Sequence, residues 1–146
     1  MTLGQMRNFC CFKANGDIIV HMDDDDIYAP DWISKSVVAL TSSVGNLTGL
    51  SSAYFKSPEQ WYLYKWPGTQ PYVIGASFCY YRSLWLNNPF KSITEGEDKK
   101  FQVGAIIRPH SYIEGFTATL HGGNTCSHKA VSFMQAITPA PSLTNQ

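Results

Sequence analysis

A short apolar run leads directly into four acidic residues in the stretch Ile18-Ile19-Val20-His21-Met22-Asp23-Asp24-Asp25-Asp26. Carboxylates crowded in this way repel one another, and at ~4 Å each pair costs about 1 kcal/mol in water and more when shielded from it. A divalent cation relieves the repulsion, and oxygen-rich clusters suit Mg²⁺ or Mn²⁺. In an extended segment side chains alternate, so we expect Asp23 and Asp25 on one face and Asp24 and Asp26 on the other. The stretch indicates a metal site or, as the plainer alternative, a solvated acidic turn.

The flanking sequence places this stretch between a strand and a helix. Residues 14–17 (Ala-Asn-Gly-Asp) are typical of a turn, and residues 18–22 of a short buried strand. Pro30 fits the first position of a helix, where its missing N–H is not needed, and Asp31 complements the helix dipole. The apolar residues that follow recur at helical spacing: Ile33, Val37 and Leu40. The aspartates therefore fall at the carboxyl end of a strand, where open α/β sheets bind ligands.

The rest of the chain predicts further short elements. A short helix is expected from Ser83 through Leu86, and a helical turn within residues 131–137. Alternating or β-branched runs predict strands at residues 47–55, 61–66, 106–108, 112–113 and 117–120.

Five segments between residues 7 and 128 carry a family pattern. They are Arg7-Asn8 with residues 14–19, residues 21–31, residues 75–85 (GASFCYYRSLW), residues 96–101 (GEDKKF) and residues 121–125 (HGGNT). The second places Asp23 and Asp25 as a DxD motif, and the fourth contains an ED motif. In this order the segments resemble the family 2 glycosyltransferases of the GT-A fold. The resemblance implies an α/β fold, namely a partial GT-A domain of the Rossmann-like nucleotide-diphospho-sugar transferase type, with a mixed sheet flanked by helices.

The resemblance implies an inverting, metal-dependent glycosyltransferase that moves a sugar from a nucleotide-sugar to an acceptor hydroxyl, in cell-surface polysaccharide or glycan synthesis. Asp25 would ligate Mn²⁺ or Mg²⁺ at the donor diphosphate, and Asp23 would act through the ribose or the metal shell. His121 would complete the metal shell, with His128 competing for that role. Taken alone, His121 is equally typical of a strand-end histidine bonded to nearby backbone.

The ED motif implies the catalytic residues. Asp98 would be the general base that removes the proton of the acceptor hydroxyl, and Glu97 would raise the pKa of that base or bind the acceptor. The plainer interpretation is that Gly96, Glu97 and Asp98 only start a helix that continues through Phe101, because Gly and Asp both favour helix starts.

Further residues of the matching segments are expected to bind substrate: Arg7, Asp24, Gly75, Ser77 and Trp85. Trp85 would stack against a sugar ring. The aromatic run at residues 61–66 is more typical of a core or a half-buried strand than of a binding platform.

The resemblance also implies that the βαβ units that precede Arg7 in the family are absent. We therefore expect residues 1–126 to be the C-terminal part of an N-terminally truncated GT-A domain, and residues 127–146 a loosely ordered tail. A fragment, a split enzyme completed by a partner chain and a reduced homologue all fit. The alternative function is a non-catalytic remnant, or half of a split enzyme, that binds carbohydrate or a partner chain.

Composition narrows the partners. The formal net charge is zero at pH 7, so nucleic acid is not an expected partner. The resemblance to family 2 glycosyltransferases implies a nucleotide-sugar donor, for which a UDP-sugar is expected, and a glycan or a lipid-linked sugar as the acceptor. Because the four cysteines show no zinc spacing and no apolar stretch approaches ~20 residues, we expect a cytoplasmic protein with reduced thiols. The resemblance implies, as an alternative, a peripheral position at the inner membrane face. Residues 75–79 (GASFC) lack the second glycine of a GxSxG elbow, so a serine hydrolase is not supported.

Overall fold

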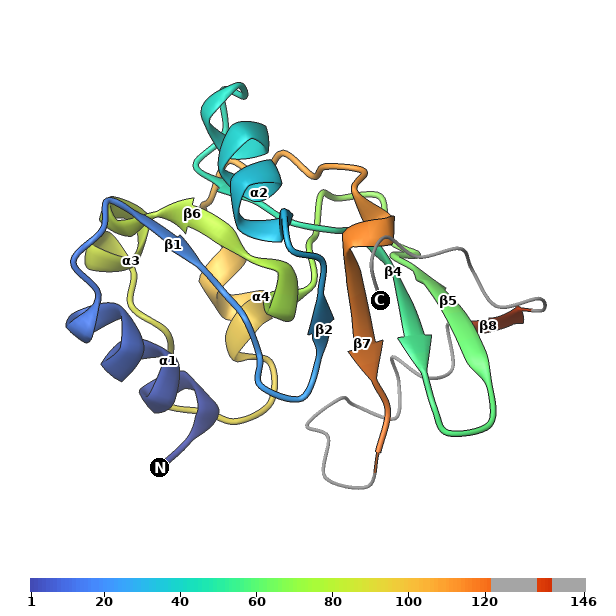
Figure 1. Cartoon of the computed structure of the whole chain (residues 1–146). Coiled ribbons are helices and arrows are strands. Elements are labelled where there is room, and N and C mark those ends of the chain that lie inside the picture. The colour runs from blue at the N-terminus through green and yellow to red at the C-terminus, as the bar shows by residue number, and fades with distance from the viewer. Residues whose placement is uncertain (122–133, 138–146) are drawn as a thin grey trace.

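The computed structural model describes residues 1–121 and 134–137 (Figure 1). Its α-helices are α1 (Leu3–Lys13), α2 (Trp32–Thr41), α3 (Arg82–Asn87) and α4 (Glu97–Gln102), with short 3₁₀ turns at Gly75–Ser77 and Ile113–Gly115. Its strands are β1 (Ile18–Val20), β2 (Ile27–Tyr28), β3 (Leu47–Thr48), β4 (Ser52–Lys56), β5 (Trp61–Lys65), β6 (Cys79–Tyr81), β7 (Phe116–Thr119) and β8 (Met134–Ile137). In the described part of the chain no helix is both long enough and apolar enough to cross a bilayer.

The strands form two sheets. The smaller has the order β1-β6-β3, and both of its pairs are antiparallel. The larger has the order β2-β7-β4-β5-β8, and it is mixed because β4 and β7 run parallel while its other pairs are antiparallel. Helices α1, α3 and α4 gather around the smaller sheet and β2, β7, β4 and β5 lie beside it (Figure 1). The predicted α/β fold with a mixed sheet flanked by helices is confirmed.

Two apolar clusters hold the elements together. The first packs the smaller sheet against α3 and α4, and its rings include Phe90 stacked on Phe101 with centroids 4.0 Å apart. The second surrounds Trp32, which is fully buried and touches the rings of Tyr28 and Phe116. Burying one such aromatic side chain stabilises a fold by about 1.5–3 kcal/mol. The first cluster fixes α4 against β1 and β6 through Phe101, and the second fixes α2 against β7.

Helix α2 differs from its prediction. It begins at Trp32, two residues after Pro30, and Asp31 makes no side-chain capping bond. The predicted apolar face was wrong in part, because Ile33 is 51% exposed while Trp32, Ser36 and Leu40 are buried. The Trp32 ring offers far more apolar area than Ile33, so its packing decides how the helix is rotated.

The strand predictions were mostly right in position. Residues 61–65 and 116–119 form β5 and β7, and residues 82–87 form α3. The expected strand at 47–55 is divided into β3 and β4, with Leu50 bridging to His110 between them. The strand expected at 112–113 was wrong, since Ile113 opens a 3₁₀ turn, and the helical turn expected within 131–137 was wrong for 134–137, which pair with β5 as β8.

The segment 106–108 contributes only an isolated bridge from Ile107 to Leu47. The predicted boundary at residues 126 and 127 lies outside the described residues, as does all of the expected tail except 134–137, and it stays a prediction.

Candidate active site

The acidic residues after β1 form a turn and not an extended segment. The amide N–H of Asp26 donates to the carbonyl oxygen of Asp23 at 3.4 Å. The turn brings carboxylate oxygens of Asp23, Asp25 and Asp26 within 4.8 Å of one another, while Asp24 is exposed and outside this group. The alternation expected of an extended strand was therefore wrong for Asp26, which joins Asp23 and Asp25 because the chain reverses between them.

Burial and mutual repulsion both disfavour the charged forms of these groups. Burial, together with the charges of Asp25 and Asp23, raises the pKa of Asp26 to about 7, although the Thr119 amide that donates to Asp26 Oδ1 at 2.9 Å opposes the shift. Burial also raises the pKa of Asp23, and the charge of Arg7 opposes that shift. Three crowded oxygens of this kind favour a divalent cation such as Mg²⁺ or Mn²⁺, which would neutralise them.

His121, two residues after the end of β7, reaches the same turn. Its Nε2 lies 3.0 Å from Oδ2 of Asp25, and both side chains are about two-fifths exposed. The structure therefore brings together the three residues predicted to hold the metal, Asp23, Asp25 and His121. The competing His128 lies outside the described residues.

Arg7 of α1 connects the acidic turn to the start of α4. Its Nε donates to Oε1 of Glu97 at 3.1 Å, and its Nη1 lies 3.6 Å from Oδ1 of Asp23. The same Nη1 lies 2.8 Å from Nδ1 of His21, which is buried. Burial and then the charge of Arg7 hold the pKa of His21 well below its usual range, so this imidazole is neutral. The guanidinium thus faces three protein groups, and its side chain is only 12% exposed.

Glu97 and Asp98 open α4 and point to different sides. Burial raises the pKa of Glu97, with the charge of Asp98 adding to the shift and Arg7 opposing it. Asp98 accepts a hydrogen bond from the Tyr72 hydroxyl at 3.0 Å and another from the Lys99 amide at 2.9 Å. Adjacent residues of a helix lie about 100° apart around its axis. Glu97 therefore faces Arg7 and the acidic turn, whereas Asp98 faces Tyr72.

Of the other predicted substrate-binding residues, Gly75 lies beside Asp98, whereas Ser77 and Trp85 are buried in the scaffold. Gly75 lies against Asp98, since a Cβ added to it would be 3.0 Å from the Asp98 Cβ, and its carbonyl oxygen is 2.9 Å from His21 Nδ1. Ser77 is fully buried, and its hydroxyl bonds the backbone of Leu50 and Ile74.

Trp85 lies in the first apolar cluster, 7% exposed, with its indole N–H donating to Asn8 Oδ1. Ser77 and Trp85 thus hold the scaffold in this structure and are not among the side chains around the aspartates.

Four residues of the network were not predicted. The role of Asp26 was missed because an extended chain was assumed. His21 lies directly after β1 and two residues before Asp23, a position that offered a weak signal. Tyr72, 26 residues before Asp98, offered none. Tyr28 also offered no signal in the sequence. Its hydroxyl accepts a hydrogen bond from the Asp23 amide and donates one to the Ala76 carbonyl.

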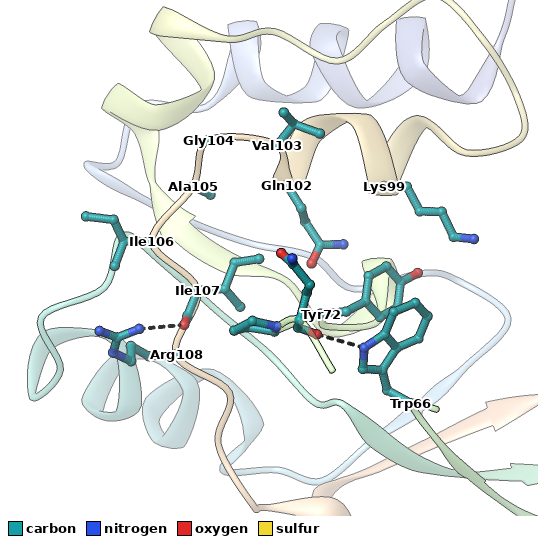
Figure 2. Close-up of a pocket in the computed structure, with 12 residues that line it drawn as sticks. Trp66, Tyr72, Lys99, Gln102, Val103, Gly104, Ala105, Ile106, Ile107 and Arg108 are labelled. Carbon is teal, nitrogen blue, oxygen red and sulfur yellow. Dashed lines mark hydrogen bonds between the residues drawn. The ribbon is translucent and has the colours of Figure 1, made fainter. Parts of the chain in front are cut away.

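A groove with a volume of about 600 Å³ adjoins Tyr72 (Figure 2). Its walls come from the loop between β5 and the first 3₁₀ turn, from the end of α4, and from the segment that follows α4. Trp66 and Tyr72 stack on one wall with ring centroids 4.3 Å apart. Tyr72 therefore lines the groove and also bonds Asp98.

Comparison with known proteins agrees with this fold. The family model described as glycosyl transferase family 2 matches residues 2–105. A crystal structure of S. aureus TarS 1-349 is similar, with a TM-score of 0.58 and 16% identity over 81% of this chain and 40% of that one. The structure of TarS 1-349 in complex with UDP-GlcNAc gives a TM-score of 0.61 and 16% identity, over 85% of this chain and 40% of that one. None of the curated proteins compared with this chain matches it.

Proposed function

This chain belongs to glycosyl transferase family 2, and we propose that it transfers a sugar from a nucleotide-sugar donor to an acceptor hydroxyl with inversion at the anomeric carbon. The observation that carries the proposal is that Arg7 links two acidic sites, the turn after β1 and the start of α4. Asp23, Asp25 and Asp26 converge within 4.8 Å, and Arg7 ties this group to Glu97 and hence to Asp98 at the start of α4.

The donor set at the acidic turn fits a metal ion. Three carboxylates and the His121 imidazole supply oxygen and nitrogen ligands that suit Mn²⁺ or Mg²⁺, and a cation there would neutralise the crowding that raises the pKa of Asp23 and Asp26. A bound divalent ion would stabilise charge on the leaving diphosphate. Arg7 would hold the acidic turn in position through its contacts with Asp23 and Glu97.

Asp98 is the proposed general base. Its carboxylate takes the proton of the acceptor hydroxyl as that oxygen forms the new bond to the anomeric carbon, and the bond from that carbon to the diphosphate breaks. The Tyr72 hydroxyl and the Lys99 amide each donate to Asp98 and fix its orientation. Gly75 has no side chain and so leaves room for the Asp98 carboxylate. A Cβ at position 75 would press against Asp98.

The donor is proposed to be a UDP-sugar, which the likeness to a TarS structure in complex with UDP-GlcNAc supports. The acceptor is proposed to be a glycan or a lipid-linked sugar, reached from the cytoplasm or the inner membrane face.

A second candidate function is that the chain completes a partner chain, or binds carbohydrate without catalysis. The chain spans 40% of the length of the TarS structures that it resembles.

The experiment that separates the two functions is UDP release from UDP-GlcNAc with Mn²⁺ and with N-acetylglucosamine as the acceptor. It compares the native chain with Asp98→Asn and with Asp17→Asn as an exposed carboxylate control. Because a general base contributes about 10²–10⁴-fold, we expect Asp98→Asn to lower kcat at least 100-fold with KM for the donor little changed. Magnetic resonance of the product would show the inverted anomer. Equal turnover by native chain and Asp98→Asn would refute the proposed base, and no turnover by a folded native chain would favour the second function.

A further inference from the structure

We infer that the groove beside Tyr72 binds the acceptor and selects one that carries a phosphate group next to its sugar. This inference rests on the proposed function, because it assigns the acceptor side of the same site. The groove, the charges at its ends and its connection to Asp98 carry it.

The groove has the size and wall of a saccharide site. Its volume of about 600 Å³ falls within the range of small-ligand sites. The stacked rings of Trp66 and Tyr72 form one wall, and the Trp66 indole is held in place by a hydrogen bond to the Gln70 carbonyl at 2.8 Å. Rigid aromatic walls of this kind bind the apolar faces of sugar rings at little entropic cost.

The charged residues that line the groove are both cations. Lys99 and Arg108 lie at opposite ends of it (Figure 2), and none of the described residues that line it is acidic. Arg108 Nη1 donates to the Ile107 carbonyl, which orients the guanidinium at its end of the groove. Arginine and lysine are the side chains that bind phosphate best. A saccharide with a phosphate fits such a groove better than a neutral one.

Tyr72 connects the groove to the proposed base. Its ring lines the groove while its hydroxyl donates to Oδ2 of Asp98 at 3.0 Å. Lys99 is the residue after Asp98 and also lines the groove. A saccharide seated against Tyr72 therefore lies next to Asp98, on the side of α4 away from the contact between Glu97 and Arg7.

The test is calorimetric titration of the full chain with N-acetylglucosamine 1-phosphate and with neutral N-acetylglucosamine. EDTA is present, so that binding through a metal at the acidic turn does not contribute. We expect a Kd at least ten-fold lower for the phosphate, and an increase of about ten-fold in that Kd for the double variant Lys99→Gln/Arg108→Gln. Lys100→Gln is the matched control, because Lys100 is an exposed lysine of the same helix that does not line the groove.

Farnesyl-diphosphate-linked N-acetylglucosamine in micelles distinguishes the sources of the phosphate. Binding of both phosphate probes supports recognition of the shared sugar-phosphate chemistry, and binding of the lipid-linked probe alone supports a lipid carrier. Equal affinity for phosphate and neutral sugar, or an unchanged Kd in the folded double variant, would overturn the inference.

Parallel titration with UDP and Mn²⁺ keeps this inference apart from the proposed function. UDP binding without any sugar-phosphate binding would refute the assignment of the groove as the acceptor site and would support the donor site. Sugar-phosphate binding that the double variant weakens, without UDP binding, supports the groove and removes the donor site.

Discussion

The guanidinium of Arg7 and the carboxylate of Glu97 meet at 3.1 Å across 90 residues of sequence. This contact joins the first helix to the start of α4, and the same guanidinium lies 3.6 Å from Asp23 in the acidic turn. The side chains of Arg7 and Glu97 are 12% and 5% exposed, so water screens the pair little. The acidic turn and the ED motif are therefore held by one buried cation.

Loss of that cation is expected to destabilise the fold. Arg7→Met leaves Glu97 buried without its partner, and breaking a buried ion pair in this way costs about 3–5 kcal/mol. Urea denaturation followed by circular dichroism measures the loss. The double variant Arg7→Met/Glu97→Gln should recover most of it, since no buried charge then remains unpaired. A double variant no more stable than Arg7→Met would show that the pair is not what the stability depends on.

The hydroxyl of Tyr80 is expected to stabilise the core beneath this pair. It lies 3.0 Å from His21 Nε2 and 3.2 Å from Cys11 Sγ, and Tyr80 is fully buried. Tyr80→Phe removes both bonds and leaves His21 a buried polar atom without its partner, which costs about 1–3 kcal/mol. Thermal unfolding should show a clear drop in Tm. Tyr81→Phe is the matched control, because the Tyr81 hydroxyl has no hydrogen bond to a described residue, and an equal drop in both variants would contradict this account.

Gly75→Ala is expected to slow transfer by displacing Asp98. The added methyl would lie 3.0 Å from Asp98 Cβ and 3.3 Å from its Oδ2, so the carboxylate must move by a few tenths of an ångström. Since misplacing a catalytic group by 1 Å can cost about 100-fold, we expect kcat for UDP release to fall about ten-fold. Gly16→Ala is the control, because its added methyl would meet nothing closer than 3.4 Å. A kcat unchanged in Gly75→Ala would show that Asp98 is not constrained here.

His110 is expected to make stability depend on pH. Burial lowers its pKa from the usual 6.5 to about 4, so between these values the unfolded chain binds more protons than the folded one. The stability that neutral His110 contributes is therefore fully present above pH 6.5. As the pH falls toward 4, the free energy of unfolding decreases by roughly 2–3 kcal/mol.

His110→Asn removes this titration while keeping an acceptor for the Tyr112 amide. Urea midpoints at several pH values should show a shallower fall between pH 7 and 4 in the variant than in the native chain. If the urea midpoints of the two proteins fell in parallel with pH, His110 would not be the source of the pH dependence.

The fold class and the two acidic segments were predictable, because both depend on local pattern. The apolar run 18–20 followed by aspartates predicts a strand end with ligands, and the segment order predicts the family. The turn at 23–26 was not predictable from alternation, since it depends on tertiary contacts such as the bond from the Thr119 amide to Asp26. The metal ligands and the base themselves stay predictions.

Long-range contacts decided most of what the sequence left open. Nothing near Tyr72 indicates that its hydroxyl meets Asp98, and nothing near Arg7 indicates Glu97 as its partner. Trp85 illustrates the reverse, because an aromatic residue in a matching segment is equally suited to a sugar or to a core, and here it packs in the core.

Whether the acidic turn is the metal-dependent donor site is tested by calorimetric titration of UDP, with and without Mn²⁺, into the native chain, Asp25→Asn and the exposed-carboxylate control Asp17→Asn. We expect binding that requires Mn²⁺, that is weakened at least ten-fold in Asp25→Asn and that is unchanged in Asp17→Asn. UDP binding of equal strength in Asp25→Asn, or independent of Mn²⁺ in all three proteins, would contradict the claim that the acidic turn is the metal-dependent donor site.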